Sequence, residues 1–231
     1  MIRSAKGLYH WLEALIAAVW FGFPSRKLTV IGVTGTDGKT TTTPLIYEIL
    51  KEAGFKVSMI TSVHAVVAGK NYDTGFHVTN PRGFEVQKYL KQAVDHGDTH
   101  FVLEVTSHGI SQHRVDFVRF AVGVLTNVTH EHLDWHKTFD AYMRVKISLL
   151  QRSNIAVINR DEAEVYNKAS ALFWNKRVVT YGIRRDAHIT PKTHPFRSKL
   201  VGQFNHYNCL AAIAATSSIN VPLRVIQKAL S

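Results

Sequence analysis

A glycine-rich loop at residues 35–40 is the segment best suited to chemistry. It follows a short apolar run and leads into a predicted helix that opens with Lys39 and Thr40. In such a loop, glycines let backbone N–H groups approach phosphates, and the helix N-terminus adds positive potential. A lysine can then neutralise the β- and γ-phosphate oxygens, and a threonine hydroxyl can hold Mg²⁺. The loop therefore predicts a site for the triphosphate of ATP with magnesium.

The loop departs from the strict phosphate-binding pattern at its first glycine. That position holds Val33, and Gly32 lies one residue too early. A purely structural strand-to-helix turn is the alternative, but it would not explain why Lys39 and Thr40 precede three further threonines. The loop residues expected around ATP are Gly35, Thr36, Asp37, Gly38, Lys39, Thr40 and Thr41.

Two more groups of polar residues stand at the ends of predicted strands. Glu104 closes an apolar run, residues 101–105, so its carboxylate is expected at the sheet edge where phosphates bind in α/β folds. Residues 130–136 hold three histidines and two acidic residues within seven positions. Imidazole and carboxylate groups can bind a second metal ion, although a polar surface loop would have the same composition.

From residue 28 onward, apolar β-branched runs alternate with amphipathic stretches. Strands are expected at residues 28–33, 57–60, 100–105, 122–128, 155–159 and 178–181. Helices are expected at residues 41–53, 83–95, 138–150, 161–171, 205–219 and 222–230. The alternation predicts an α/β fold with a doubly wound, mainly parallel sheet. Residues 65–79 suggest an inserted hairpin or loop, and residues 184–199 a connector.

The composition of the chain narrows the class of protein. Its 231 residues are 45% hydrophobic and 19% charged, which is typical of a globular protein, and its net charge is +11. An excess of basic residues favours small anionic partners such as nucleotides. The Lys and Arg residues are scattered along the sequence, which argues against nucleic acid as the partner. The single cysteine, Cys209, allows no disulfide within the chain and no Cys-based zinc site, which suits the cytoplasm.

The first 27 residues form a separate segment, in which residues 8–23 predict an apolar helix. Glu13 and His10 interrupt it, and a membrane-spanning helix needs about 20 apolar residues. We expect the helix to pack on the domain that follows. The alternative is a helix lying in the membrane interface, where Trp11 and Trp20 would give the chain a peripheral membrane contact.

The glycine-rich loop is one of a series of short motifs in a fixed order. The series comprises residues 35–41, 103–110, 112–115, 126–127, 132–136, 142–146, 159–162, 181–182 and 202–208. It resembles the central ATP-binding domain of the Mur ligases, and within them the branch that extends UDP-N-acetylmuramoyl-dipeptide. The resemblance covers roughly residues 28–231 and implies a P-loop type fold. It also implies that the family's N-terminal UDP-binding domain and C-terminal amino-acid-binding domain are absent from this chain.

The resemblance implies a reaction in peptidoglycan precursor synthesis. The γ-phosphate of ATP passes to a substrate carboxylate, and the amine of an incoming amino acid attacks the acyl phosphate, with one or two Mg²⁺ ions neutralising charge. The implied catalytic residues are Lys39, Glu104, His132 and Lys146. The implied metal ligands are Thr40, Glu104, His132 and a carbamylated Lys146. Further ATP contacts are Asn127, Asn205 and Asn208, and contacts to the UDP-sugar-peptide are Thr79, Asn80, Thr106, Gln112 and Arg114.

Lys146 is the residue for which helix spacing and resemblance disagree. Tyr142, Lys146 and Leu150 lie four apart on one helix face, and that spacing alone favours a surface lysine. The resemblance instead implies a desolvated lysine whose amine becomes neutral and is carbamylated.

The chain departs from the family pattern at several points. Asn80 replaces the second threonine of Thr-Thr-Pro, Thr106 replaces a serine, and His130-Glu131 replaces Arg-Asp. Because the resemblance implies that the two flanking domains are absent, we expect the chain to keep the site for acyl phosphate formation without completing the amide bond by itself. A non-catalytic or regulatory Mg-ATP-binding module is the alternative. Folate polyglutamylation is disfavoured, because residues 112–114 and 132–136 resemble the muramoyl-peptide branch.

Overall fold

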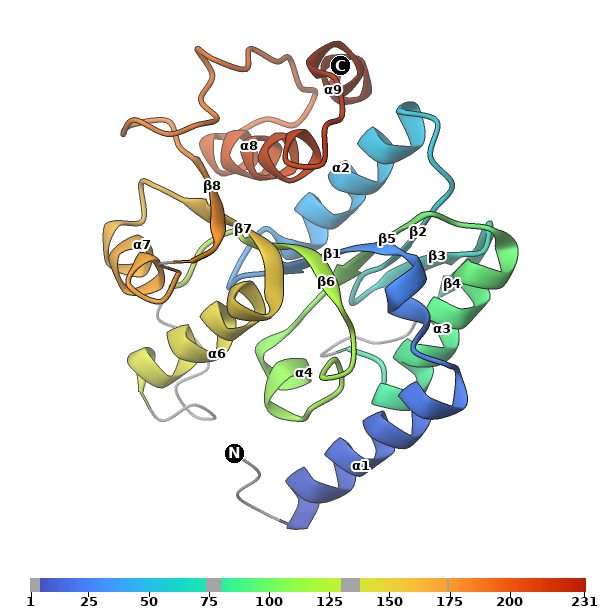
Figure 1. The fold of residues 1–231 in the computed structure, drawn as a ribbon. Coiled ribbons are helices and arrows are strands. Elements are labelled where there is room, and N and C mark those ends of the chain that lie inside the picture. Colours follow the sequence, from blue (N-terminus) through green and yellow to red (C-terminus); the bar gives the residue numbers. More distant parts are fainter. Residues whose placement is uncertain (1–4, 74–79, 130–137, 174) are drawn as a thin grey trace.

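The computed structural model describes residues 5–73, 80–129, 138–173 and 175–231. Within these residues one eight-stranded sheet runs in the order β4-β3-β2-β5-β1-β6-β7-β8 (Figure 1). Its strands are β1 Thr29–Thr34, β2 Val57–Ile60, β3 His64–Val67, β4 Lys70–Asp73, β5 His100–Glu104, β6 Phe120–Leu125, β7 Ser153–Asn159 and β8 Arg177–Tyr181. In this order, each strand from β2 to β8 pairs in parallel with the next one. At the other end of the sheet, β3 pairs antiparallel with both β2 and β4, and β3 and β4 form a hairpin at the edge. The predicted α/β fold is thus confirmed, and the described part of the hairpin or loop predicted at residues 65–79 is the β3–β4 hairpin.

Helices cover both faces of the sheet, as Figure 1 shows. Those on one face are α2 Lys39–Glu52, α8 Gln203–Ser217 and α9 Leu223–Leu230, which share a core cluster with β1 and β6. Those on the other are α3 Gly83–His96, α4 Ser107–Ser111, α6 Phe139–Arg152 and α7 Ala163–Ser170. Strands buried on both sides need apolar residues at successive positions, which is why the central strands β1 and β6 are mostly apolar along their length.

The central strand β1 lies between β5 and β6, so the chain crosses from one side of the sheet to the other at this point. Val33 pairs with Glu104 on β5, and Thr34 pairs with Leu125 on β6. The loops that follow these three strands therefore emerge side by side at one edge. In open α/β sheets such a switch point forms a crevice for ligands.

The N-terminal helix α1, Ala5–Trp20, packs on α3, as the sequence predicted. Its residues Ala14, Ala17 and Ala18 are buried, and a side chain at Gly83 would come within 2.9 Å of Ala14, so the two helices touch closely. The opposite face of α1 is exposed. It presents Leu8, Tyr9, Leu12, Ile16, Val19 and Trp20.

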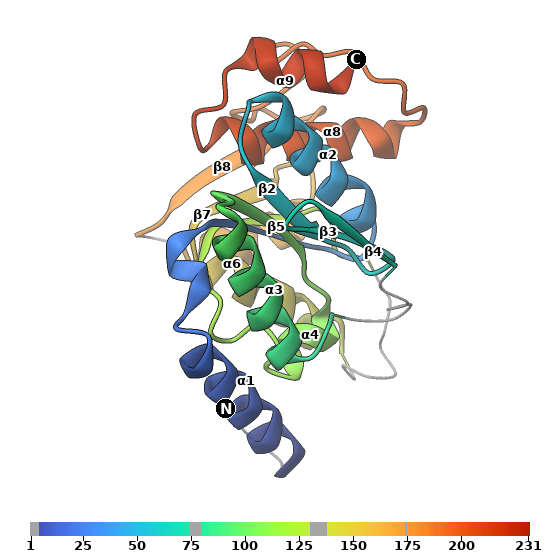
Figure 2. The same cartoon turned by 90° about the vertical axis from the view of Figure 1, so that its right-hand side faces the viewer.

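Figure 2 shows α1 extending at the end of the molecule opposite α9. A short helical turn, η1 (Pro24–Lys27), joins α1 to the sheet. In the part of the chain that the structure describes, no helix has both the length and the apolar character needed to cross a membrane.

One short helix, α4, was not predicted from the sequence. It begins where Thr106 caps it by accepting a hydrogen bond from Gly109 N at 3.0 Å. Its five residues are too few to give a helical period, so only the capping geometry identifies it. The predicted connector is confirmed, because the segment between β8 and α8 contains no helix or strand.

Candidate nucleotide and metal site

The glycine-rich loop joins β1 to α2 and passes very close to two other segments. A side chain at Gly35 would collide with the Thr126 hydroxyl, and one at Gly38 would collide with the Asn208 side chain. Gly38 also has φ 79°, a left-handed conformation that favours glycine. These glycines allow the loop to fold against the residues that follow β6 and against α8.

Thr36 lies at the centre of the contacts that hold the loop in place. Its backbone N–H donates to Asn127 O at 2.9 Å, and its carbonyl accepts from Lys39 Nζ at 2.8 Å. Its hydroxyl accepts from Thr129 N at 3.0 Å and lies 3.2 Å from the Tyr142 hydroxyl. The loop is therefore ordered by the protein itself.

A small cavity of 160 Å³ lies beside the loop and collects most of the predicted metal ligands. It is lined by Gly35, Lys39, Thr40, Ser62, Glu104, Thr106, Ser107, His108, Tyr142 and Lys146. Thr40 Oγ1 donates to the Glu104 carboxylate at 3.1 Å, and Ser62 N–H donates to the same carboxylate at 3.0 Å. Glu104 is only 2% exposed. Hydroxyl and carboxylate oxygens are the ligands that Mg²⁺ prefers, so this cavity suits that ion.

Lys146 is buried, with 1% of its surface exposed, so the surface-lysine interpretation is wrong. Its Nζ donates to Gly35 O and lies 4.5 Å from the centroid of the Tyr142 ring. Burial follows from the position of α6, which packs against β6 and β7 and directs this face of the helix toward the loop. The structure thus brings Lys146 to the phosphate loop, and its carbamylation stays a prediction.

Four of the predicted substrate contacts form one connected group next to Glu104. The Asn80 side chain donates to Glu104 O, and its Oδ1 accepts from Thr106 N at 2.8 Å and from the Thr106 hydroxyl at 3.1 Å. Arg114 donates through Nη1 to Asn80 O and through Nη2 to Gln112 Oε1 at 2.6 Å. Asn80, which replaces a threonine of the family pattern, therefore fixes the end of β5.

Burial lowers the pKa of Arg114, and the charge of Arg82 acts in the same direction. Its Nε is buried and has no hydrogen-bond partner within the described residues. An arginine whose Nη atoms are both held by the protein carries its positive charge in a fixed position.

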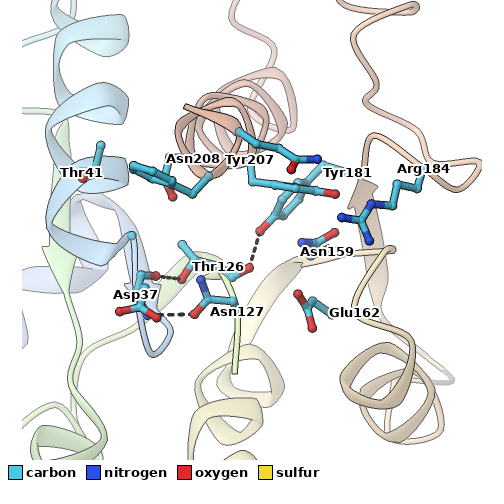
Figure 3. A pocket seen from close by; sticks show the side chains of 13 residues that line it. Asp37, Thr41, Thr126, Asn127, Asn159, Glu162, Tyr181, Arg184, Tyr207 and Asn208 are labelled. Carbon is cyan, nitrogen blue, oxygen red and sulfur yellow. Dashed lines mark hydrogen bonds between the residues drawn. The ribbon is translucent and has the colours of Figure 1, made fainter. Parts of the chain in front are cut away.

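A larger cavity of 660 Å³ opens on the other side of the loop (Figure 3). It is lined by Asp37, Gly38, Thr41, Thr126, Asn127, Asn159, Glu162, Tyr181, Arg184, Gln203, Phe204, Tyr207 and Asn208. Its floor is braced by Tyr181, whose hydroxyl donates to Thr126 O at 2.9 Å, and by Thr126, whose hydroxyl donates to Asp37 O at 2.6 Å. Asp37 N–H in turn donates to Asn127 Oδ1 at 2.8 Å. This volume adjoins the phosphate loop and is large enough for a nucleoside.

Comparison with known proteins identifies the family. A family model described as "Mur ligase middle domain" matches residues 33–216. The chain belongs to this family.

Among its relatives is a protein of Clostridium perfringens named "UDP-N-acetylmuramoyl-L-alanyl-D-glutamate--2,6-diaminopimelate ligase". The identity is 32% over 238 residues, covering 94% of this chain and 49% of the relative. A protein of the same name from Gloeobacter violaceus is 36% identical over 236 residues, covering 94% of this chain and 48% of the relative. This Mur ligase chain thus spans about half the length of the curated relatives that it matches.

Solved structures show the same fold. A ligase with that same name superposes with a TM-score of 0.74 at 24% identity, over 88% of this chain and 46% of that one. Escherichia coli FolC in complex with DHPP and ADP superposes with a TM-score of 0.72 at 19% identity, over 94% of this chain and 60% of that one. At such identities the likeness establishes the architecture alone.

The structure of this Mur ligase domain places several further residues of the predicted site. Asn127 and Asn208 line the larger cavity, and Asn208 donates from Nδ2 to Asn205 Oδ1 at 3.2 Å. Asn205 is not among the residues that line the cavity, so its contact with ATP stays a prediction. His132 and Thr79 lie outside the described residues, and their roles also stay predictions.

Sequence reasoning assigned no role to Ser62, although this residue contacts Glu104. The position of Ser62 in the sequence was an indication, because it comes almost directly after β2, and β2 pairs in parallel with β5. Only the strand order, however, places the end of β2 beside Glu104. The structure therefore places Ser62 beside the candidate metal site, where its N–H holds the Glu104 carboxylate.

Proposed function

We propose that this chain forms the ATP-binding centre of a Mur-type amide ligase of peptidoglycan precursor synthesis. Its substrates would be ATP, UDP-N-acetylmuramoyl-dipeptide and an amino acid. The observation that carries the proposal is the position of Glu104. Its carboxylate faces Thr40 of the phosphate loop, and its backbone carbonyl accepts from Asn80 of the group that includes Arg114. One residue thus joins the nucleotide site to the predicted substrate site. Because ATP and the UDP-linked dipeptide are cytoplasmic compounds, we propose that the chain is located in the cytoplasm.

The reaction would proceed in two steps. A carboxylate oxygen of the dipeptide attacks the γ-phosphorus, a new O–P bond forms, and the bond to the β–γ bridging oxygen breaks as ADP leaves. The amine nitrogen then attacks the acyl carbon, the C–O bond to phosphate breaks, and phosphate leaves while the amine loses a proton. Such chemistry depends mainly on positioning and on neutralising the phosphate charge.

Each group of residues has a distinct part in this scheme. Lys39 and the loop N–H groups would bind the β- and γ-phosphates. Thr40 and Glu104 would hold Mg²⁺, which when bound neutralises phosphate charge and orients the γ-phosphate, and the Ser62 N–H would orient the Glu104 carboxylate. His132 and a carbamylated Lys146 would hold a second ion. Substrate contacts would come from Thr79, Asn80, Thr106, Gln112 and Arg114, and ATP contacts from Asn127, Asn205 and Asn208.

The alternative, a regulatory Mg-ATP-binding module, is not favoured, because the relatives at 32% and 36% identity are named as ligases. Such a module would use the phosphate loop and the larger cavity, and it would have no need for Arg114 to be held next to Glu104. The two candidates differ in whether ADP formation depends on the dipeptide substrate.

Hydroxylamine trapping tests the first step without requiring an amino-acid pocket. With ATP, Mg²⁺ and UDP-N-acetylmuramoyl-dipeptide, we expect ADP and an acyl hydroxamate in equal amounts, because hydroxylamine attacks the acyl phosphate. Glu104→Gln should lower this rate by about 100-fold, since it weakens metal binding at the transferred phosphate. Products are read by mass spectrometry.

The matched control is Glu164→Gln, an exposed residue of α7 that pairs with Lys168. It should leave the rate unchanged. ATP binding without substrate-dependent hydroxamate would reject the ligase proposal and favour the binding module.

We also propose that the exposed face of α1 contacts an anionic lipid surface. Six large apolar side chains lie on this face, and Trp20 among them is 77% exposed. Lys6 lies at the start of the helix, and Arg26 and Lys27 follow it in η1, all three exposed. Apolar residues with an aromatic residue at the helix end and flanking basic residues are typical of interfacial helices, and the net charge of +11 complements anionic headgroups.

Vesicle co-sedimentation tests this contact. We expect the chain to sediment with phosphatidylglycerol-containing vesicles, less at high salt, and the double variant Ile16→Gln/Trp20→Gln to bind about 10-fold more weakly, because it removes apolar burial. Leu172→Gln, at an exposed apolar residue outside α1, is the control. Equal binding by the double variant would contradict the proposal. The proposal would also be contradicted if the unmodified chain self-associated and the double variant did not, because a second copy of the chain would then cover this face.

A further inference from the structure

The far wall of the larger cavity is built from three segments that are distant in sequence. One is the turn between β7 and α7, at residues 159–162. The second follows β8 at residues 182–185, and the third is the start of α8 at residues 203–208. Figure 3 shows Tyr207, Arg184 and Glu162 facing the cavity from these segments. Something must hold the three together if the wall is to have a defined shape.

Asp161 contacts all three. Its carboxylate accepts from Ile183 N at 2.7 Å, Arg184 N at 3.0 Å and Arg185 N at 2.8 Å, so three successive N–H groups converge on one side chain. It also accepts from the Tyr207 hydroxyl at 2.8 Å. Asp161 itself is not among the residues that line the cavity.

The neighbouring backbone is adapted to this arrangement. A side chain at Gly182 would come within 3.2 Å of Asp161 Oδ1, so the absence of a side chain there lets the turn close around the carboxylate. Asp161 N–H donates to Asn159 Oδ1 at 3.0 Å, which fixes the turn from which the carboxylate projects. The geometry is that of an anion nest occupied by a side chain of the same protein.

The protonation states favour these hydrogen bonds at neutral pH. Burial opposes ionisation of Asp161, but the hydrogen bonds from Arg184 N, Ile183 N, the Tyr207 hydroxyl and Arg185 N outweigh it and lower the pKa of the carboxyl group. Burial and the hydrogen bond to Asp161 raise the pKa of Tyr207 to about 12. The carboxylate is therefore charged and the phenol keeps its proton to donate.

We propose that Asp161 is a positioning residue for the nucleoside end of ATP, acting through the Tyr207 ring and the turn that carries Arg184. The inference rests on the proposed function, in which the nucleoside occupies the larger cavity. The phosphate loop depends on other contacts, centred on Thr36, and within the described residues no hydrogen bond of the Asp161 carboxylate reaches that loop. Loss of Asp161 should thus affect the nucleoside end and spare the triphosphate end.

Comparison of two probes on the 231-residue chain separates these ends. Mg-ATP reports on both ends, and Mg-tripolyphosphate reports on the phosphate loop alone. Asp161→Asn replaces one acceptor oxygen by an amide donor, so it should weaken Mg-ATP binding by about 10-fold, as expected for loss of charge-assisted hydrogen bonds. Its affinity for Mg-tripolyphosphate should stay within about 2-fold of the unmodified chain, measured by calorimetry.

Tyr207→Phe gives a second and milder variant. It keeps the ring and removes only the hydroxyl, so we expect a smaller loss for Mg-ATP and again none for tripolyphosphate. Asp95→Asn is the matched control, because Asp95 is an exposed residue of α3 that pairs with Lys91. It should bind both probes as the unmodified chain does.

The ratio of the two affinities decides the outcome. An equal loss for both probes would mean that Asp161 only supports the fold, and no loss for either would mean that the wall does not need it; each result overturns the inference. If Asp161→Asn fails to fold, the same ratio measured on Tyr207→Phe decides. Failure of the unmodified chain to bind either probe would instead overturn the proposed function, and this inference with it.

Discussion

Mg-ATP is expected to stabilise the unmodified chain, and Lys39→Ala is expected to abolish this effect. At a hundredfold excess over Kd, a ligand that binds only the folded state adds about 2.7 kcal/mol to the free energy of unfolding. For a domain of this size that corresponds to a rise of roughly 5–10 °C in Tm. Lys39 lies on the cavity that contains Thr40 and Glu104, and we propose that its amine binds the phosphates. The measurement is a thermal melt with and without millimolar Mg-ATP.

Lys51→Ala supplies the control for this experiment. Lys51 lies in the last turn of the same helix, is exposed, and pairs with Glu48. Its removal should leave the ATP-dependent rise in Tm intact. If the unmodified chain shows no rise, or if Lys39→Ala shows the full rise, the assignment of the loop as the triphosphate site is wrong.

Asn80→Ala is expected to lower the free energy of unfolding by about 2–4 kcal/mol, because buried polar groups without partners cost about 1–3 kcal/mol each. Asn80 is 4% exposed, and its side chain bonds both Glu104 O and Thr106 N. Alanine would leave these backbone groups buried without this partner. The corresponding fall in Tm is about 5–15 °C, and denaturant unfolding measures the free energy directly.

Asn167→Ala tests whether that loss is specific. Asn167 is an exposed residue of α7, so the same change there should shift the free energy of unfolding by less than about 0.5 kcal/mol. A loss at Asn80 no larger than at Asn167 would show that its hydrogen bonds do not support the end of β5.

Local patterns were sufficient to predict most of the fold. The strand that ends at Thr34 and the helix that begins at Lys39 are adjacent in sequence, so the phosphate loop between them could be recognised from neighbouring residues. At residues 65–79 the sequence predicted a hairpin or loop with Gly69 near its middle, and the structure has the β3–β4 hairpin there, with φ 73° at Gly69. Strand ends were less certain, since the predicted strand 122–128 stops at Leu125.

Features that depend on tertiary contacts could not be predicted from the residues alone. Lys146 is buried because α6 directs it toward Gly35, which is 111 residues away in sequence. Tyr207 and Asp161 are 46 residues apart, and only the folded chain brings them together. In each case the sequence shows that a residue can form hydrogen bonds. Which residue becomes its partner depends on the order of the strands in the sheet.

The hydrogen bond from Lys39 to the Thr36 carbonyl has a consequence for how nucleotide enters the site. The lysine side chain already has a partner and a fixed position before ATP arrives. The ammonium group carries three N–H donors, so a phosphate oxygen can join the Thr36 carbonyl as a further acceptor. Up to about 2 kcal/mol of side-chain entropy has been lost beforehand, so association does not incur that cost.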